Sequence, residues 1–295
     1  MILPNLLLPS RANQCWQESG IDSFERCIDR SHFLQYPHEI EYQYNSRGFR
    51  DAEWPKRLEN LIWCVGDSFT TGIGSPYSHI WPQVLGQKSS IGTINVSMDG
   101  ASNNWIARRA VDIINEFTPT NIVILWSYVE RCELSSEEII PPQWKIFYSA
   151  VKDPSWPQCD DYRDFQNLPL AIRQELQNHY CGNYIYITDD CSSIEMTGLA
   201  DELRSNNQNL RLTDQEDLDN FKQCESSVSE LKSKTNIIQA FIPKFSKPEL
   251  AKKYISLCEN NCIGPIPRLD IARDGHHFDI KTSQWFTEKV IPFLK

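Results

Sequence analysis

The sequence predicts an α/β fold in which helices cover a central parallel sheet. From about residue 60 onward, short apolar runs alternate with amphipathic helical patterns, which is typical of parallel α/β proteins. The apolar runs are rich in β-branched and aromatic residues, as expected of strands buried on both faces. The chain has 295 residues, of which 40% are hydrophobic and 23% charged, so it can fill one sizeable core.

Four segments are the expected strands of this sheet: residues 61–65, 93–97, 121–127 and 236–243. Each is short and apolar, and each is bounded by polar or turn-forming residues. They lie far enough apart for helices to connect them, so we expect crossover connections between parallel neighbours.

Three segments are the expected helices, at residues 102–119, 213–235 and 279–295. The first begins with a capping serine, Ser102, and stops at Pro119. The second carries acids early and lysines late, which suits the helix macrodipole. One face of the first helix is apolar and is expected to pack on the sheet: Ile106, Ala110, Ile113 and Ile114.

Two parts of the chain lack this alternation of strand and helix patterns. Residues 1–44 are expected to form an N-terminal extension to a main domain at 45–295. Within that domain, residues from about 133 to 213 contain five prolines and only weak periodicity. Long irregular segments inside a compact domain are usually functional or disordered, so we expect an irregular insertion beside the functional site.

Charge and hydropathy exclude several classes of function. The formal net charge is −10 and no dense Lys/Arg run is present, so nucleic acid is not an expected partner. No run of about 18 apolar residues occurs, so no membrane span is expected. The first ten residues lack a positively charged lead and contain two prolines, and we therefore expect a cytoplasmic protein.

The ten cysteines are scattered along the chain, which favours reduced thiols over a disulfide framework. Cys258 and Cys262 together with His276 and His277 could be read as a zinc site, but adjacent histidines fit zinc ligand spacing poorly, and no metal is expected. The remaining histidines, expected at surface or satisfied core positions, have no partner at an informative spacing: His32, His38, His79 and His179.

The segment with the clearest chemistry is the strand at 61–65 followed at once by Gly66, Asp67 and Ser68. A serine hydroxyl is a weak nucleophile unless a neighbouring base takes its proton, so it must lie where a histidine can reach it. Gly66 would let the chain turn off the strand, and a following helix would point free N–H groups at a developing oxyanion. Neither a dinucleotide-binding fingerprint, nor a P-loop, nor a Gly-x-Ser-x-Gly elbow is present.

This Gly-Asp-Ser block after a strand resembles the first block of the SGNH, or GDSL-like, hydrolases, and residues 45–55 resemble the lead-in of many bacterial members. The resemblance implies a three-layer α/β/α, flavodoxin-like fold with Ser68 as nucleophile. It further implies that Gly100 supplies an oxyanion N–H, together with that of Ser68. The last family block, Asp-x-x-His, implies Asp274 and His277 as the acid and base of a triad.

The third family block is missing. Family members carry Gly-x-Asn-Asp after the third strand, and the asparagine donates to the oxyanion, whereas here the strand runs into residues 127–134 without an asparagine. The loss of such a donor costs about 10²- to 10³-fold in rate, so a substitute is needed. Asn103 is the first choice because it lies close to Gly100 in sequence, and Asn104 and Arg131 are the alternatives.

The expected function is hydrolysis of an O-acyl ester, with acetyl esters of carbohydrate or a similar small ester as the first choice of substrate. No cofactor is expected. The alternatives are an O-acyltransferase and a catalytically impaired glycan-binding protein on the same fold. The oligomeric state stays open.

Overall fold

The structure is a computed structural model of the whole chain. It describes residues 6–8, 11–129, 134–135, 185–187, 193–196, 214–243, 248–258 and 261–295. The chain divides into two compact units. The first contains residues 1–128 and 221–295, and the second contains residues 129–220.

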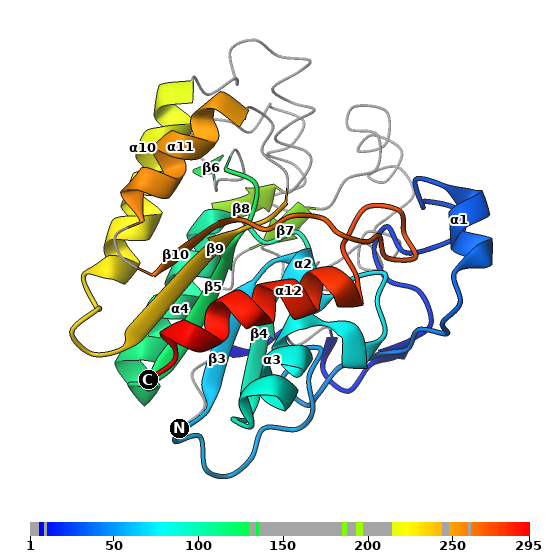
Figure 1. Cartoon of the computed structure of the whole chain (residues 1–295), viewed down its shortest axis with the longest axis horizontal. Coiled ribbons are helices and arrows are strands. Elements are labelled where there is room, and N and C mark those ends of the chain that lie inside the picture. Colours follow the sequence, from blue (N-terminus) through cyan, green and yellow to red (C-terminus); the bar gives the residue numbers. More distant parts are fainter. Residues whose placement is uncertain are drawn as a thin grey trace, which may run out of the picture. The chain divides into compact units, whose positions relative to one another are not determined.

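The first unit is built on a five-stranded parallel sheet (Figure 1). Its strands are β3 (Ile62–Gly66), β4 (Thr93–Ser97), β5 (Asn121–Trp126), β9 (Asn236–Phe241) and β10 (Cys262–Pro265). The order across the sheet is β10-β9-β5-β3-β4, and every neighbouring pair is parallel. Counted along the chain this is the order 2-1-3-4-5 of flavodoxin-like sheets, so the predicted fold class is confirmed.

Helices cover both faces of this sheet. Figure 1 shows α3 (Trp81–Ser89) and α12 (Ile280–Val290) side by side on one face. The other face is covered by α4 (Asn103–Phe117) and by the part of α10 (Asp214–Ser229) that belongs to the first unit. The helix α11 (Pro248–Leu257) precedes β10 and contacts α10, since the rings of Tyr254 and Phe221 lie 5.3 Å apart.

The alternation of side chains along the strands explains the three layers. Cys64 of β3 packs with Trp81 of α3 and Phe286 of α12 in one fully buried cluster. Trp63, the preceding residue on β3, points to the opposite face and stacks on Phe117 of α4 at 4.9 Å. The apolar face predicted for α4 is buried, and Ser102 caps this helix by accepting a hydrogen bond from the N–H of Trp105.

Residues before the sheet belong to the same unit. They form β1 (Cys15–Trp16), which pairs antiparallel with β2 (Tyr42–Gln43), and the short helix α1 (Arg30–Gln35). Two further short elements follow β3: α2 (Ser68–Thr71) and a 3-10 turn at Tyr77–His79.

The second unit is described only in part. Its described residues form a three-stranded antiparallel sheet in the order β6-β8-β7, made of Leu134–Ser135, Ser193–Met196 and Ile185–Ile187. Most of the predicted insertion at 133–213 lies outside the described residues, so its role stays a prediction. Among the residues that the structure describes, no helix combines the length and the apolar character that a membrane span needs.

The predicted strands are confirmed with small shifts at their ends, and the strand at 93–97 matches its bounds. Three predicted elements are too long: β5 ends at Trp126, β9 ends at Phe241, and α10 ends at Ser229. The predicted C-terminal helix also stops early, because Pro292 follows in a short 3-10 turn at Ile291–Phe293.

Candidate active site

β3 and β5 are the first and third strands of the sheet in chain order, and they are neighbours in space. The strand order reverses between them. In open α/β sheets ligands bind at this point, beyond the carboxyl ends of the strands. Ser68 lies there, two residues after the end of β3, as the first residue of α2. The topology therefore brings the predicted nucleophile to the usual binding edge of such a sheet.

Asp67 fixes the turn that presents Ser68. Its Oδ1 caps α2 by accepting a hydrogen bond from the N–H of Phe69 at 3.0 Å. Its Oδ2 accepts a hydrogen bond from the hydroxyl of Ser127 at 2.5 Å, and Ser127 follows β5 directly. Asp67 is fully buried, so this bond ties together the ends of the two strands between which Ser68 lies.

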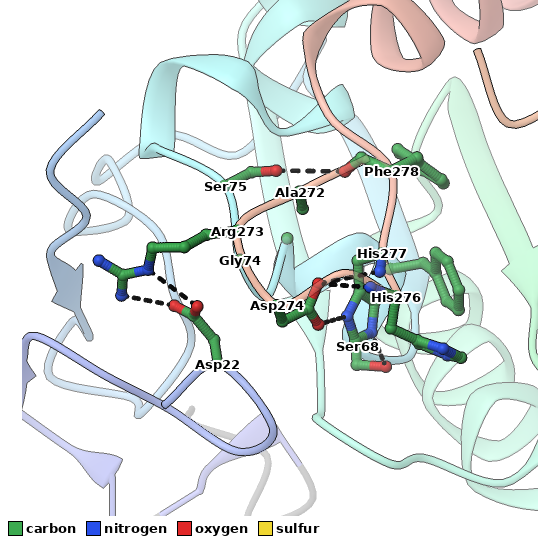
Figure 2. Close-up of polar contacts among 12 residues, drawn as sticks. Asp22, Ser68, Gly74, Ser75, Ala272, Arg273, Asp274, His276, His277 and Phe278 are labelled. Atoms are coloured by element: carbon green, nitrogen blue, oxygen red, sulfur yellow. Dashed lines mark hydrogen bonds and ion pairs between the residues drawn. The ribbon is translucent and has the colours of Figure 1, made fainter. Parts of the chain in front are cut away.

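The three predicted triad residues meet. Figure 2 shows Ser68, His277 and Asp274 in one line. The Nε2 atom of His277 lies 2.8 Å from the Oγ of Ser68, and its Nδ1 is hydrogen-bonded to Oδ2 of Asp274. The exposed fractions of Ser68, His277 and Asp274 are 4%, 3% and 0%, so water screens these contacts little.

The backbone fixes the orientation of the acid. The Oδ1 of Asp274 accepts the N–H groups of His276 and His277, both at 3.0 Å, so only Oδ2 faces the imidazole. A carboxylate only accepts, so Nδ1 of His277 must donate to it. In the neutral imidazole this leaves the lone pair on Nε2, directed at the Ser68 hydroxyl, which is the tautomer that a general base requires.

The charges around His277 favour its protonated form. Burial by itself lowers the pKa of this imidazole, but the charge and hydrogen bond of Asp274, with the charges of Asp99 and Asp67, outweigh burial and raise the pKa above its ordinary value. For Asp274, burial acts to raise the pKa, and the attraction of His277 with the hydrogen bonds outweighs it, so the pKa is lowered. The pair is thus built to hold an imidazolium beside a carboxylate.

The predicted oxyanion groups lie on neighbouring loops. The N–H of Ser68 is in the first turn of α2, where backbone donors have no partner within the helix. Gly100 follows β4, the neighbour of β3, and its φ of 78° is a conformation that glycine adopts most easily. The N–H of Met98 donates to the carbonyl of Gly66 at 3.2 Å, which holds the start of this loop against the end of β3.

Asn103 is linked to the turn at Asp67 by hydrogen bonds through Ser127. Its Oδ1 accepts the N–H of Ser127 at 3.0 Å, and its Nδ2 donates to the carbonyl of Tyr128 at 2.9 Å. Because the Ser127 hydroxyl is bonded to Asp67, only one residue separates the fully buried Asn103 from the turn that carries the predicted nucleophile. The bond to Tyr128 uses one of the two hydrogens of the amide nitrogen.

The other candidates differ in their surroundings. Asn104 is partly exposed on α4, and Arg131 lies outside the described residues. His276 points away from Asp274 in Figure 2, and its Nε2 lies 3.0 Å from the hydroxyl of Tyr128. Nδ1 of His79 lies 2.8 Å from a carboxylate oxygen of Asp279. The two residues are 200 positions apart, so this pairing could not be predicted from the sequence.

Ser127 was not predicted from the sequence as a residue of this site. It bonds both to Asp67 and to Asn103 and so joins the loops after β3 and β5 to the start of α4. The one feature of the sequence that could have indicated its role is its position directly after the third strand. Within the described part of the chain, no cluster of three or more His, Cys, Asp or Glu side chains is arranged to hold a metal ion.

Comparisons with known proteins find similarity only among solved structures. No family model matches the sequence, and no curated protein matches it. A lipolytic protein of the G-D-S-L family from Desulfitobacterium hafniense is similar at 14% identity with a TM-score of 0.37, over 80% of this chain and 99% of that chain.

Two carbohydrate esterases are similar over a smaller part of their own length. A family two carbohydrate esterase from Clostridium thermocellum, solved with cellohexaose, has 11% identity and a TM-score of 0.40, over 82% of this chain and 65% of that one. An acetyl xylan esterase from Butyrivibrio proteoclasticus has 12% identity with the same TM-score and coverage. One of these proteins is named as lipolytic and two are named as esterases.

Proposed function

We propose that this chain is a serine ester hydrolase of the SGNH type, with Ser68 as nucleophile, His277 as general base and Asp274 as its orienting acid. The observation that carries the proposal is the 2.8 Å contact between the Ser68 hydroxyl and Nε2 of His277. This is hydrogen-bond distance for proton transfer, and the imidazole is in turn held by a buried carboxylate.

The proposed reaction has two halves. Nε2 of His277 takes the proton of the Ser68 hydroxyl as Oγ attacks the ester carbonyl, and the resulting imidazolium then protonates the leaving alcohol. An acyl-serine remains. In the second half His277 takes a proton from water, the hydroxide attacks the acyl carbon, and the proton returns to Ser68 as the acid leaves.

The oxyanion formed in each half needs donors. The proposed donors are the N–H groups of Ser68 and Gly100, with Asn103 in place of the asparagine of the missing third block. Support for Asn103 comes from its burial and from its link through Ser127 to the turn at Asp67. A donor held at both its oxygen and its nitrogen is preorganised, as oxyanion stabilisation requires.

The proposed substrates are small O-acyl esters, with acetyl esters of carbohydrate first. This choice follows from the family resemblance of the sequence motifs, and the buried triad itself requires only an ester carbonyl. The enzyme needs no metal or cofactor in this mechanism, because the proton transfers all pass through His277.

The test is turnover of an aryl acetate and of an acetylated oligosaccharide by the whole protein. Wild type should release acetate, and Ser68→Ala should lose turnover while keeping its thermal transition. Ser89→Ala, at the far end of α3, is the matched control and should keep wild-type rates. If Ser68→Ala turns over as wild type does, the assignment fails.

Product analysis separates hydrolysis from the acyltransferase alternative. With a sugar acceptor present, a hydrolase releases free acetate, whereas a transferase yields an acetylated acceptor. The non-catalytic alternative predicts glycan binding without release of acetate, and the meeting of all three triad residues argues against it.

A further inference from the structure

An ion pair joins the N-terminal part of the chain to the residue beside the proposed catalytic acid. Arg273 precedes Asp274, and its Nε and Nη2 donate to the two carboxylate oxygens of Asp22 at 2.9 and 2.7 Å. Asp22 is fully buried, and the hydroxyl of Tyr42 also donates to it, at 2.5 Å. The bidentate geometry fixes the guanidinium plane as well as its distance.

The rest of the Arg273 side chain is held by the same part of the chain. Its Nη2 also donates to the carbonyl of Gln17 at 2.8 Å, and its guanidinium lies over the ring of Phe33 at 4.7 Å. These hydrogen bonds and this ring contact all come from residues 17–33, far from Ser68 in sequence.

Gly74 connects these N-terminal contacts to Asp274. Its carbonyl accepts the N–H of Arg273, and its own N–H donates to the hydroxyl of Tyr42, both at 2.8 Å. Figure 2 shows Gly74 between the Asp22–Arg273 pair and Asp274. A Cβ atom on Gly74 would lie 2.9 Å from Oδ1 of Asp274, so this backbone is packed against the carboxylate.

A second attachment holds the backbone of the acid itself. The N–H of Ile28 donates to the carbonyl of Asp274 at 3.1 Å. The Nε2 of His32 lies 2.8 Å from the carbonyl of Ala272. The acid is therefore fixed by the N-terminal part from two sides, through Arg273 and through its own carbonyl.

From these contacts we infer that Asp22 is a positioning residue of the triad: by fixing Arg273 and, through Tyr42, Gly74, it holds Asp274 in line with His277. The inference rests on the proposed function and deepens it. It gives the contacting residues between 17 and 42 a role in the proposed active site.

The charge of Asp22 has a second effect. Without it, Arg273 would be a cation without a carboxylate partner, one residue before Asp274, and its side chain is only 12% exposed. Both the loss of alignment and the freed cation disfavour the imidazolium. The carboxylates that face His277 from other loops, Asp67 and Asp99, would remain.

The test is Asp22→Asn in the whole protein, with Asp112→Asn as matched control. Asp112 forms an Asp–Arg pair with Arg109 on α4 at 3.2 Å, away from the triad. Asp22→Asn should lower kcat by about 10- to 100-fold, because a misplacement of about 1 Å costs on that order, while KM stays within about twofold. Asp112→Asn should keep both constants.

A second measurement tests the positioning of Asp274 and does not depend on catalytic turnover. The titration of the His277 imidazole, followed by NMR, should move to lower pH in Asp22→Asn and stay unchanged in Asp112→Asn. A lower thermal transition with unchanged kcat and unchanged titration would make Asp22 a purely structural residue and would overturn the inference.

The two proposals can fail separately. If wild type has no ester turnover, the proposed function fails, and the NMR titration still decides whether Asp22 positions the Asp274–His277 pair. If Asp22→Asn does not fold, Tyr42→Phe serves instead, because it removes only the hydroxyl that links Asp22 to Gly74. It should lower kcat and the titration midpoint in the same direction, and an unchanged midpoint would overturn the inference.

Discussion

Replacing Asp274 with Asn tests the orientation of the proposed base. Two backbone N–H groups, those of His276 and His277, point at Oδ1 of Asp274. The oxygen of an asparagine amide must occupy that side, since its NH2 group would meet two donors. The NH2 group therefore faces Nδ1 of His277, which must then accept, and the proton moves to Nε2. The imidazole is left in the wrong tautomer to take a proton from Ser68.

The magnitude follows from this geometry. The same change of tautomer in a serine triad lowers kcat by about 10⁴-fold, which corresponds to about 5 kcal/mol of barrier. The assay is the initial rate of aryl acetate hydrolysis over a range of about pH 5 to 9, where imidazole titrates, with circular dichroism to check the fold. Asp219→Asn, on an exposed part of α10, is the control. A rate for Asp274→Asn within about tenfold of wild type would show that Asp274 does not set the tautomer of His277.

Four further outcomes are expected. Because the pKa of His277 is raised, kcat/KM should increase with pH with a midpoint above the ordinary imidazole value; a midpoint below it would contradict the charge argument. Gly74→Ala should lower the free energy of unfolding by about 1–2 kcal/mol, measured with denaturant, because φ is 78° there, and should also lower kcat because Cβ crowds Asp274. Asn103→Ala should lower kcat by about 10²-fold at unchanged KM, and wild-type turnover would exclude it as a donor. Phe286→Ala should cost about 3–5 kcal/mol of stability in a denaturant titration, and an unchanged midpoint would contradict its place in the core.

The parts of the fold that the sequence predicted are those with local patterns. The strands β3, β4, β5 and β9 are continuous apolar runs, and α4 has both a capping serine and a regular apolar face. Two elements that break such patterns were not predicted: Gly86 interrupts α3, and Gly264 and Pro265 weaken β10.

The site divides in the same way. Ser68, Asp274 and His277 belong to short motifs with fixed spacing, and such motifs can be recognised in the sequence alone. Asp22 carries no such signal, because its partner Arg273 is 251 residues away and many carboxylates in the chain could equally have met that guanidinium. Only the packing of residues 17–42 against residues 272–274 brings Asp22 to this guanidinium.

Whether Ser68 is an activated nucleophile is tested by covalent labelling of the whole protein with a fluorophosphonate, followed by peptide mass spectrometry. An activated serine attacks phosphorus, displaces fluoride and retains the phosphonyl group, so we expect one adduct, on Ser68, which disappears in His277→Ala. No adduct on folded protein, or an adduct on another serine with Ser68 unmodified, would contradict it.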